Sequence, residues 1–370
     1  MIKQGKLKIE FGVLGLILAL AFSAFAQTPQ TTPPPVEDND VIRVESRLVI
    51  VPVSITDSAG QPVLNLKKED FLVREENKQQ EVAQISDAEK VPLEIALLFD
   101  ISASTDSMFK FQQETAAKFL QDVMRPDDRA TIFTVGANAT LIQARDSADK
   151  SAVAIRSIIP TKEQTAFYDA VSAAANYLRK NTPQGRRKVV VVISDGEDTN
   201  SASVVKAIWD AERKLVNSAR GEELRNIRVK ARDAAKVREQ GRVLQALQNA
   251  DTVFYSINPA GSSYQLNKIS QFGQSNLQRF ADETGGAAFL PKFQPTDLKD
   301  GYQNTANTRV NQETLTRIFR QLANELQAQY LVQYYSESDF PNNKYVKLDV
   351  GLRNPRNFRI RARKGYFVKK

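Results

Sequence analysis

Histidine and cysteine are both absent from this chain of 370 residues. Without histidine there is no Ser-His-Asp triad and no histidine-ligated metalloenzyme, and without cysteine there is no Cys-His pair. The missing cysteines also exclude disulfide bonds and lipid attachment at a signal-peptide cysteine. The chain must therefore be stable through its core alone, and the commonest nucleophile–base pairs are unavailable to it.

Glycine-rich phosphate-binding loops of the two common types are missing as well. Hydrolysis by paired carboxylates or by a Ser-Lys pair stays open on residue content, because Glu197 and Asp198 stand next to polar loop residues. The alternative interpretation of these two carboxylates is solvation of a turn. Since no nucleophile–base constellation is recognisable, we predict a protein that is not an enzyme.

Basic residues followed by an apolar stretch stand at the N-terminus. Lys3, Lys6 and Lys8 precede an uncharged run that ends in Ala24-Phe25-Ala26. Residues 1–26 have the parts of a secretory signal peptide, so we expect an exported protein, periplasmic or extracellular. The alternative is an uncleaved anchor, but the run is shorter than the ~20 apolar residues of a membrane span. No stable membrane span is expected after cleavage, and residues 27–40 form a proline-rich linker.

Positive charge is concentrated at the other end of the chain. The net charge is +8, and residues 352–370 contain basic side chains but no acidic one. Phe358, Ile360 and Ala362 alternate with arginines there, which predicts a strand with one buried and one solvated face. No nucleic-acid partner is expected, because no binding motif accompanies the charge. Contact with anionic envelope polymers is an open alternative.

Both ends of the mature chain are rich in β-branched and aromatic residues. Residues 41–91 and 330–370 each contain several short strand patterns separated by turns. Neither end alone has enough strands for a stable sheet with a buried face. We therefore predict that the two ends pair into one flanking β-sandwich module.

Residues 92–329 alternate short apolar strands with amphipathic helices, which predicts an α/β domain with a doubly wound, mostly parallel sheet. Strands are expected at 93–99, 130–135, 189–194, 253–257 and 287–290, with a short edge strand at 140–144. Helices are expected at about 107–123, 150–158, 166–180, 202–219, 275–284 and 312–328.

One crossover is too long for this plan. Residues 202–250 contain no proline, and two apolar stripes flank Gly221. The stripes are Val204, Ile208, Ala211, Leu215 and Ala219 before the glycine, and Leu224, Ile227, Ala231 and Ala234 after it. We interpret this segment as a helical insertion, a hairpin that breaks near Gly221. It is rich in basic residues, which fits either a solvated surface or an arm for a partner.

Five oxygen-bearing side chains fall in three loops of the α/β region. They are Asp100, Ser102, Ser104, Thr165 and Asp195. Two of these loops follow apolar runs, and ligands of parallel sheets lie beyond the carboxyl ends of the strands. Carboxylate and hydroxyl oxygens without nitrogen or sulfur suit Mg²⁺, or else Mn²⁺ or Ca²⁺. Each piece alone has a plainer interpretation, since Ser104 and Thr165 could be helix N-caps and Ser194-Asp195-Gly196 a turn.

The order and spacing of these residues resemble a von Willebrand factor type A domain with a metal-ion-dependent adhesion site (MIDAS). The motif is Asp100-Ile101-Ser102-Ala103-Ser104, followed by Thr165 and then by Asp195. The flanking segments, among them 53–57, 70–73 and 361–367, resemble secreted bacterial proteins of the acidobacterial von Willebrand factor A-related type. The Thr165 loop lacks the glycines of many relatives, and the helical insertion has no counterpart in a minimal domain.

The resemblance implies a non-enzymatic adhesion or assembly module. Its metal would be completed by an Asp or Glu of a protein partner, with Ser102, Ser104 and Thr165 holding the ion and the aspartates acting directly or through water. The helical insertion suggests a second partner. The alternative is a structural envelope protein in which the metal only stabilises the fold, and a metal-dependent hydrolase is the third candidate.

Overall fold

The structure is a computed structural model that describes residues 46–102, 107–161, 163–214, 221–259, 268–296 and 299–369. All of these belong to one compact unit, Glu45–Lys370. The predicted signal peptide (1–26), the linker (27–40) and Ser104 lie outside the described residues.

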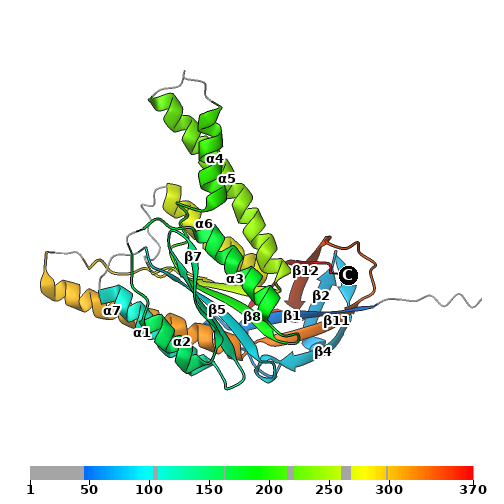
Figure 1. Ribbon diagram of the computed structural model, residues 1–370. Helices are drawn as coiled ribbons and strands as arrows, with labels where there is room; N and C mark the ends of the chain where they lie inside the picture. Colours follow the sequence, from blue (N-terminus) through cyan, green and yellow to red (C-terminus); the bar gives the residue numbers. More distant parts are fainter. Residues whose placement is uncertain are drawn as a thin grey trace, which may run out of the picture. The chain divides into compact units, whose positions relative to one another are not determined.

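Six strands form the central sheet, in the order β10-β9-β8-β5-β6-β7 (Figure 1). Five run parallel, namely β5 (Leu93–Asp100), β6 (Arg129–Val135), β8 (Arg187–Ile193), β9 (Thr252–Ile257) and β10 (Ala288–Phe289). The sixth, β7 (Ala139–Asp146), runs antiparallel at the edge. All residues of β5 and β9 are buried, because a strand covered on both faces has no solvent side. The predicted α/β fold class with a mostly parallel sheet is confirmed.

Helices cover both faces of this sheet, so that it has two hydrophobic cores. One face packs against α1 (Ser107–Val123), α2 (Ala148–Arg156) and α7 (Gly301–Gln327). The other packs against α3 (Phe167–Asn181), α5 (Glu222–Asn249) and α6 (Lys268–Thr284). Alternate residues of β5 enter opposite cores, with Leu97 in the first and Leu98 in the second.

A β-sandwich flanks the α/β domain. Its sheets have the orders β13-β1-β11-β4 and β14-β12-β2-β3. The N-terminal half of the chain supplies β1 (Arg47–Thr56), β2 (Phe71–Glu75), β3 (Lys78–Gln80) and β4 (Val82–Asp87), with the short 3₁₀ helices η1 (Lys68–Asp70) and η2 (Ala88–Lys90). The C-terminal end supplies β11 (Tyr330–Ser336), β12 (Tyr345–Leu352), β13 (Arg359–Ala362) and β14 (Gly365–Phe367). Each sheet pairs strands from both ends of the chain, β1 with β11 and β2 with β12, as predicted.

The basic residues of the C-terminal strand differ from the expectation of a solvated face. Arg361 forms an ion pair of 2.5 Å with Glu325 of α7, and Arg363 forms one with Asp251. Both arginine side chains are largely buried, at 17% and 14% exposure. The prediction of a wet face holds for the exposed Arg359. It is wrong for these two because the sandwich packs against the α/β domain, a contact that alternation in one strand does not show.

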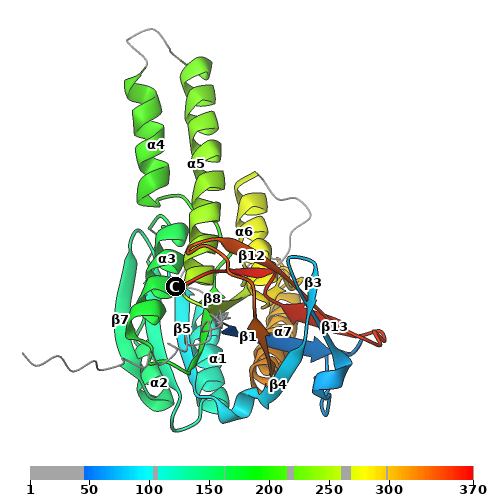
Figure 2. The same cartoon turned by 90° about the vertical axis from the view of Figure 1, so that its right-hand side faces the viewer.

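The insertion forms a helical hairpin of α4 (Ala202–Arg213) and the first part of α5, which projects beyond the other helices (Figures 1 and 2). Residues 215–220, where two predicted stripe residues fall, lie outside the described part. Only the base of the hairpin enters the core, through Val204 of α4 and residues from Ala235 onward of α5. Ala234, which we expected on the apolar stripe, is exposed, and Ala235 is buried instead.

The start of α7 lies eleven residues before the predicted position. Asp300 caps the helix by accepting hydrogen bonds from the amides of Tyr302 and Gln303. The first turns are polar and carry no apolar stripe, so hydrophobic periodicity could not reveal them. Asn307 and Asn311 instead bind the backbone of the preceding segment. Among the described residues, no helix is long and apolar enough to cross a membrane.

A buried carboxylate joins the two sheets of the sandwich. Glu75 of β2, 1% exposed, accepts hydrogen bonds from three hydroxyl groups. Their donors are Tyr334 (2.9 Å) and Ser336 (2.7 Å) of β11 and Tyr366 (2.6 Å) of β14. The network fixes how the sheets lie against each other, because the hydroxyls of Tyr334 and Ser336, which belong to the opposite sheet, lose their acceptor if the sheets shift.

We predict that Glu75→Ala lowers the free energy of unfolding by about 3 kcal/mol, because three buried hydroxyl groups lose their acceptor. Urea denaturation followed by circular dichroism measures this loss. Tyr335→Phe is the control, since Tyr335 lies on β11 between Tyr334 and Ser336, with 53% of its surface exposed. The control should change stability by less than about 0.5 kcal/mol, and equal effects of the two substitutions would contradict the network's role.

Candidate metal site

Two of the predicted ligands lie at the carboxyl edge of the central sheet, on adjacent strands. Asp100 is the last residue of β5, and Asp195 lies two residues beyond the end of β8. The strands pair in parallel, with Phe99 opposite Ile193, so both carboxylates are at the same edge. This is the edge at which ligands of open α/β sheets bind.

Asp100 is held by hydroxyl groups on both of its oxygens. Its Oδ1 accepts from the amide (3.0 Å) and the hydroxyl (2.6 Å) of Ser102. Its Oδ2 accepts from the hydroxyl of Ser194 at 2.6 Å. The side chain is buried, and burial raises the pKa of the Asp100 carboxyl, although these hydrogen bonds oppose the rise. Asp100 is thus oriented by hydrogen bonds, and no lysine or arginine of the described residues forms an ion pair with it.

The charged form of the Asp195 side chain is destabilised by its surroundings. Burial, together with repulsion from Asp100, raises the pKa of Asp195 to about 6. One oxygen accepts a hydrogen bond of 2.9 Å from the amide of Glu197. Within the described residues, no lysine or arginine forms an ion pair with Asp100 or Asp195. Two carboxylates with raised pKa and no counter-ion form a place where a cation would be stabilised.

Thr165 lies in a neighbouring loop that is joined to the other two by backbone hydrogen bonds. Its carbonyl oxygen accepts from the amides of Thr199 (2.8 Å) and Asn200 (3.0 Å). At the other end of the loop, the amide of Thr161 donates to the carbonyl of Ile101 at 2.6 Å. The loops that carry Asp100, Thr165 and Asp195 are therefore adjacent. The structure brings Asp100 and Ser102 into direct contact and places Asp195 within electrostatic reach.

The N-terminus of α3 has a cap that the sequence did not reveal. Ala166, not Thr165, is the N-cap residue. The first amides of α3 instead find acceptors in a distant loop, from Tyr168 to Asp198 (3.1 Å) and from Asp169 to Ser201 (3.2 Å). Asp169 in turn accepts from the amide of Ala202, at the start of α4. The two helix ends cap each other, and this leaves the Thr165 side chain free of the capping role.

Asp198 was considered with Glu197 as a candidate for hydrolysis, and the structure gives it a different role. Its carboxylate accepts hydrogen bonds from the Tyr168 amide and from the amide and hydroxyl of Ser201. The side chain is 1% exposed. Asp198 therefore holds the two helix ends together. An Asp three residues before a Ser at a predicted helix start was the available signal.

Gly196 allows α6 to approach the site closely. Its φ is +76°, and a Cβ at this position would lie 2.5 Å from the carbonyl oxygen of Gly273. A Cβ on Gly273 would likewise lie 2.7 Å from the carbonyl oxygen of Asp195. Two glycines are needed for this contact, which closes one side of the Asp195 loop.

The donor set suits a hard divalent cation, because it consists of carboxylate and hydroxyl oxygens. Asp100, Ser102 and Asp195 supply such oxygens, with Thr165 in the adjoining loop and Ser104 outside the described residues. No cluster of three or more carboxylates that could hold a metal ion occurs in the described part of the chain. Occupation of this set by Mg²⁺, Mn²⁺ or Ca²⁺ stays a prediction.

Residues 95–197 match the family model of the von Willebrand factor type A domain. The match begins within β5 and ends just after Asp195, so it contains all three predicted ligand loops. Domains of this type typically mediate protein–protein interaction or adhesion. No curated protein matches the chain.

Solved structures similar to the chain include the von Willebrand factor type A from Catenulispora acidiphila, with 13% identity and a TM-score of 0.38 over 72% of this chain and 52% of that one. Another is proximal thread matrix protein 1 from the mussel byssus, with 10% identity and a TM-score of 0.38 over 64% and 48%. A further structure of the mussel protein has a zinc-occupied MIDAS motif, with 13% identity and a TM-score of 0.39 over 68% and 50%. The chain spans about half the length of these proteins.

We predict that the metal-free protein becomes more stable as the pH falls from 7.5 to 4.5, relative to Asp195→Asn. The folded-state pKa of Asp195, about 6, exceeds the ordinary value of 3.8. A raised carboxyl pKa destabilises the fold fully above about pH 6, and the cost decreases as the pH falls from there toward 3.8. The advantage of the Asn variant should be about 3 kcal/mol at pH 7.5 and should shrink to about 1 kcal/mol at pH 4.5.

Chemical denaturation in chelator at several pH values measures this difference. Addition of Mg²⁺ at pH 7.5 should stabilise the wild type and leave Asp195→Asn unchanged. A stability difference that does not vary with pH would show that the Asp195 carboxyl is not destabilised by its surroundings.

Proposed function

We propose that this chain is an exported, non-enzymatic protein-binding module that binds a divalent cation and uses it to coordinate an acidic residue of a protein partner. The observation that carries the proposal is the pair of carboxylates, Asp100 and Asp195, placed without a counter-ion at the carboxyl edge of the sheet. The match of residues 95–197 to the von Willebrand factor type A domain supports the same role.

The cation would be Mg²⁺, or else Mn²⁺ or Ca²⁺, held by Ser102, Ser104 and Thr165 directly, with Asp100 and Asp195 acting directly or through water. With two carboxylates and otherwise neutral hydroxyls, few of the ligands of such an ion carry negative charge. An Asp or Glu of the partner would add both a donor and a negative charge. Burial of that carboxylate in an interface would be costly without the metal, so metal and partner would depend on each other.

The non-enzymatic part of the proposal is supported by the residues around the site. The chain has no histidine or cysteine. Asp198, the neighbouring carboxylate that could have paired with Glu197, already accepts three hydrogen bonds that cap α3 and α4. A paired-carboxylate hydrolase needs both groups facing the substrate, and this arrangement uses one of them for structure.

The alternative is a structural envelope or assembly protein in which the metal only stabilises a loop. The helical hairpin supports this alternative. Trp209, the one tryptophan of the chain, lies on α4 with 64% of its surface exposed. Exposed tryptophans are enriched at protein interfaces. The hairpin would then be the main docking surface, or a second one beside the metal site.

We predict that the immobilised full chain retains a protein from an envelope extract of the source cell in Mg²⁺ and loses it in chelator. Asp100→Ala should lose the same protein, because the cation is no longer held. Asp149→Ala is the matched control, since Asp149 is an exposed aspartate on α2, outside the site. Circular dichroism establishes that each variant is folded.

The competing candidates give different results in this experiment. Retention that survives both chelator and Asp100→Ala, but is lost in Trp209→Ala, would replace the metal-dependent proposal by docking on the hairpin. Hydrolysis of the retained protein that Asp195→Ala abolishes would favour an enzyme.

A further inference from the structure

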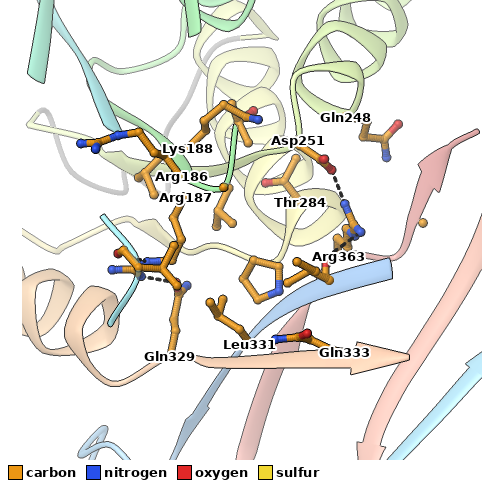
Figure 3. Close-up of a pocket in the computed structure, with 18 residues that line it drawn as sticks. Arg186, Arg187, Lys188, Gln248, Asp251, Thr284, Gln329, Leu331, Gln333 and Arg363 are labelled. Atoms are coloured by element: carbon orange, nitrogen blue, oxygen red, sulfur yellow. Dashed lines mark hydrogen bonds and ion pairs between the residues drawn. The ribbon is translucent and has the colours of Figure 1, made fainter. Parts of the chain in front are cut away.

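A cavity of about 260 Å³ lies at the opposite edge of the central sheet from the candidate metal site (Figure 3). Its walls are the first residues of β8 and β9 together with β1 and β11 of the sandwich. Lys188, near the start of β8, and Asp195, beyond its end, are roughly 20 Å apart at 3.3 Å per residue. The cavity is therefore a separate place in the fold.

Part of the lining is apolar. It consists of Ile50, Pro52, Val189, Val253 and Leu331. These side chains come from both the α/β domain and the sandwich, and Figure 3 shows Leu331 on β11 below the start of β8. Such a surface favours a ligand with an apolar portion, and the volume is at the small end for ligand pockets.

Two neighbouring cations of the lining, Arg187 and Lys188, form no ion pair among the described residues, although Asp128 attracts the first and Asp251 the second at longer range. Arg187, 9% exposed, donates to the carbonyl of Leu326 (2.9 Å) and to the side-chain oxygen of Gln329 (3.0 Å). Burial lowers the pKa of Arg187 to about 10 and also lowers the pKa of Lys188. Buried charges in proteins are normally paired, so an anion in this cavity would offset part of the cost of burying positive charge there.

The remaining charges of the lining do not neutralise this pair. The one carboxylate of the lining, Asp251, is engaged by Arg363, as Figure 3 shows, and by Lys369 at 4.0 Å. Arg186 is paired with Glu94 at 2.5 Å. Asp251 also attracts Lys188, but it is shared among several cations, so the lining keeps a net positive charge.

Hydrogen-bond donors are also in excess at this cavity. Nε2 of Gln248 and Nε of Arg363 are buried and have no acceptor among the described residues. Both residues line the cavity, near Asp251. These donors and the positive charge of the lining together favour a ligand that is a negatively charged hydrogen-bond acceptor.

We propose that this cavity binds a small organic acid. Its carboxylate lies against Lys188, on the side of the cavity with Gln248 and Arg363, and its apolar body packs on Ile50, Pro52 and Leu331. An inorganic anion would satisfy the charge but leave the apolar wall uncovered, and a neutral molecule would leave the cations unpaired. The ligand would contact both the α/β domain and the sandwich, and so would hold them together.

Titration calorimetry of the full chain with hexanoate, hexanamide and sulfate tests this proposal. We expect hexanoate to bind, and hexanamide and sulfate to bind at least about tenfold more weakly. Lys188→Gln should weaken hexanoate binding at least about tenfold. The control is Lys347→Gln, because Lys347 is an exposed lysine in the middle of β12; this change should have no effect.

Absence of hexanoate binding would overturn the proposal, as would equal affinity for hexanamide or sulfate. A Lys188→Gln variant that binds hexanoate as the wild type does would overturn it too. Should this variant fail to fold, reductive methylation of the wild type with mass-spectrometric readout gives the same information. Hexanoate should then slow modification of Lys188 relative to Lys347, and equal rates with and without hexanoate would contradict the site.

Discussion

The apposition of two carboxylates at the ends of neighbouring parallel strands is the constraint on which the candidate site depends. The register of β5 and β8 fixes Asp100 and Asp195 at one edge, where burial raises the pKa of both groups and repulsion from Asp100 raises that of Asp195 further. Hydroxyl groups of Ser102 and Ser194 orient Asp100 but bring no positive charge. A cation is the species that would relieve this repulsion, and a cation with an open position would attract a further carboxylate.

The two ends of strand β8 carry side chains of opposite charge. β8 begins with Arg187 and Lys188 beside the cavity and leads to Asp195 at the candidate metal site. The interior of the strand is a run of valines that is buried on both faces. Polar chemistry is therefore confined to the ends of the strand, where loops and the sandwich meet the sheet. Because helices cover both faces of the sheet, the ends of its strands are the places left for charged groups.

The sequence was most informative where the pattern is local. Apolar runs predicted the buried strands, and Asp100 and Asp195 followed from their position directly after two of them. The sandwich was predicted because neither end of the chain has enough strands alone. Asp198 and Ser194 were missed as supporting residues, because their partners, Tyr168 and Asp100, are distant in sequence. The ion pairs of Arg361 and Arg363 and the cavity beside Lys188 also depend on the packing of two domains, which no periodicity of a single segment contains.

The most direct measurement of the central claim is the anomalous difference map of a crystal of the protein grown with Mn²⁺. The account predicts one strong peak at the carboxyl edge of the sheet, bounded by Asp100, Ser102, Thr165 and Asp195, and no such peak in crystals of Asp195→Asn. A map without a peak between these residues, or with the ion bound elsewhere on the chain, would contradict the account.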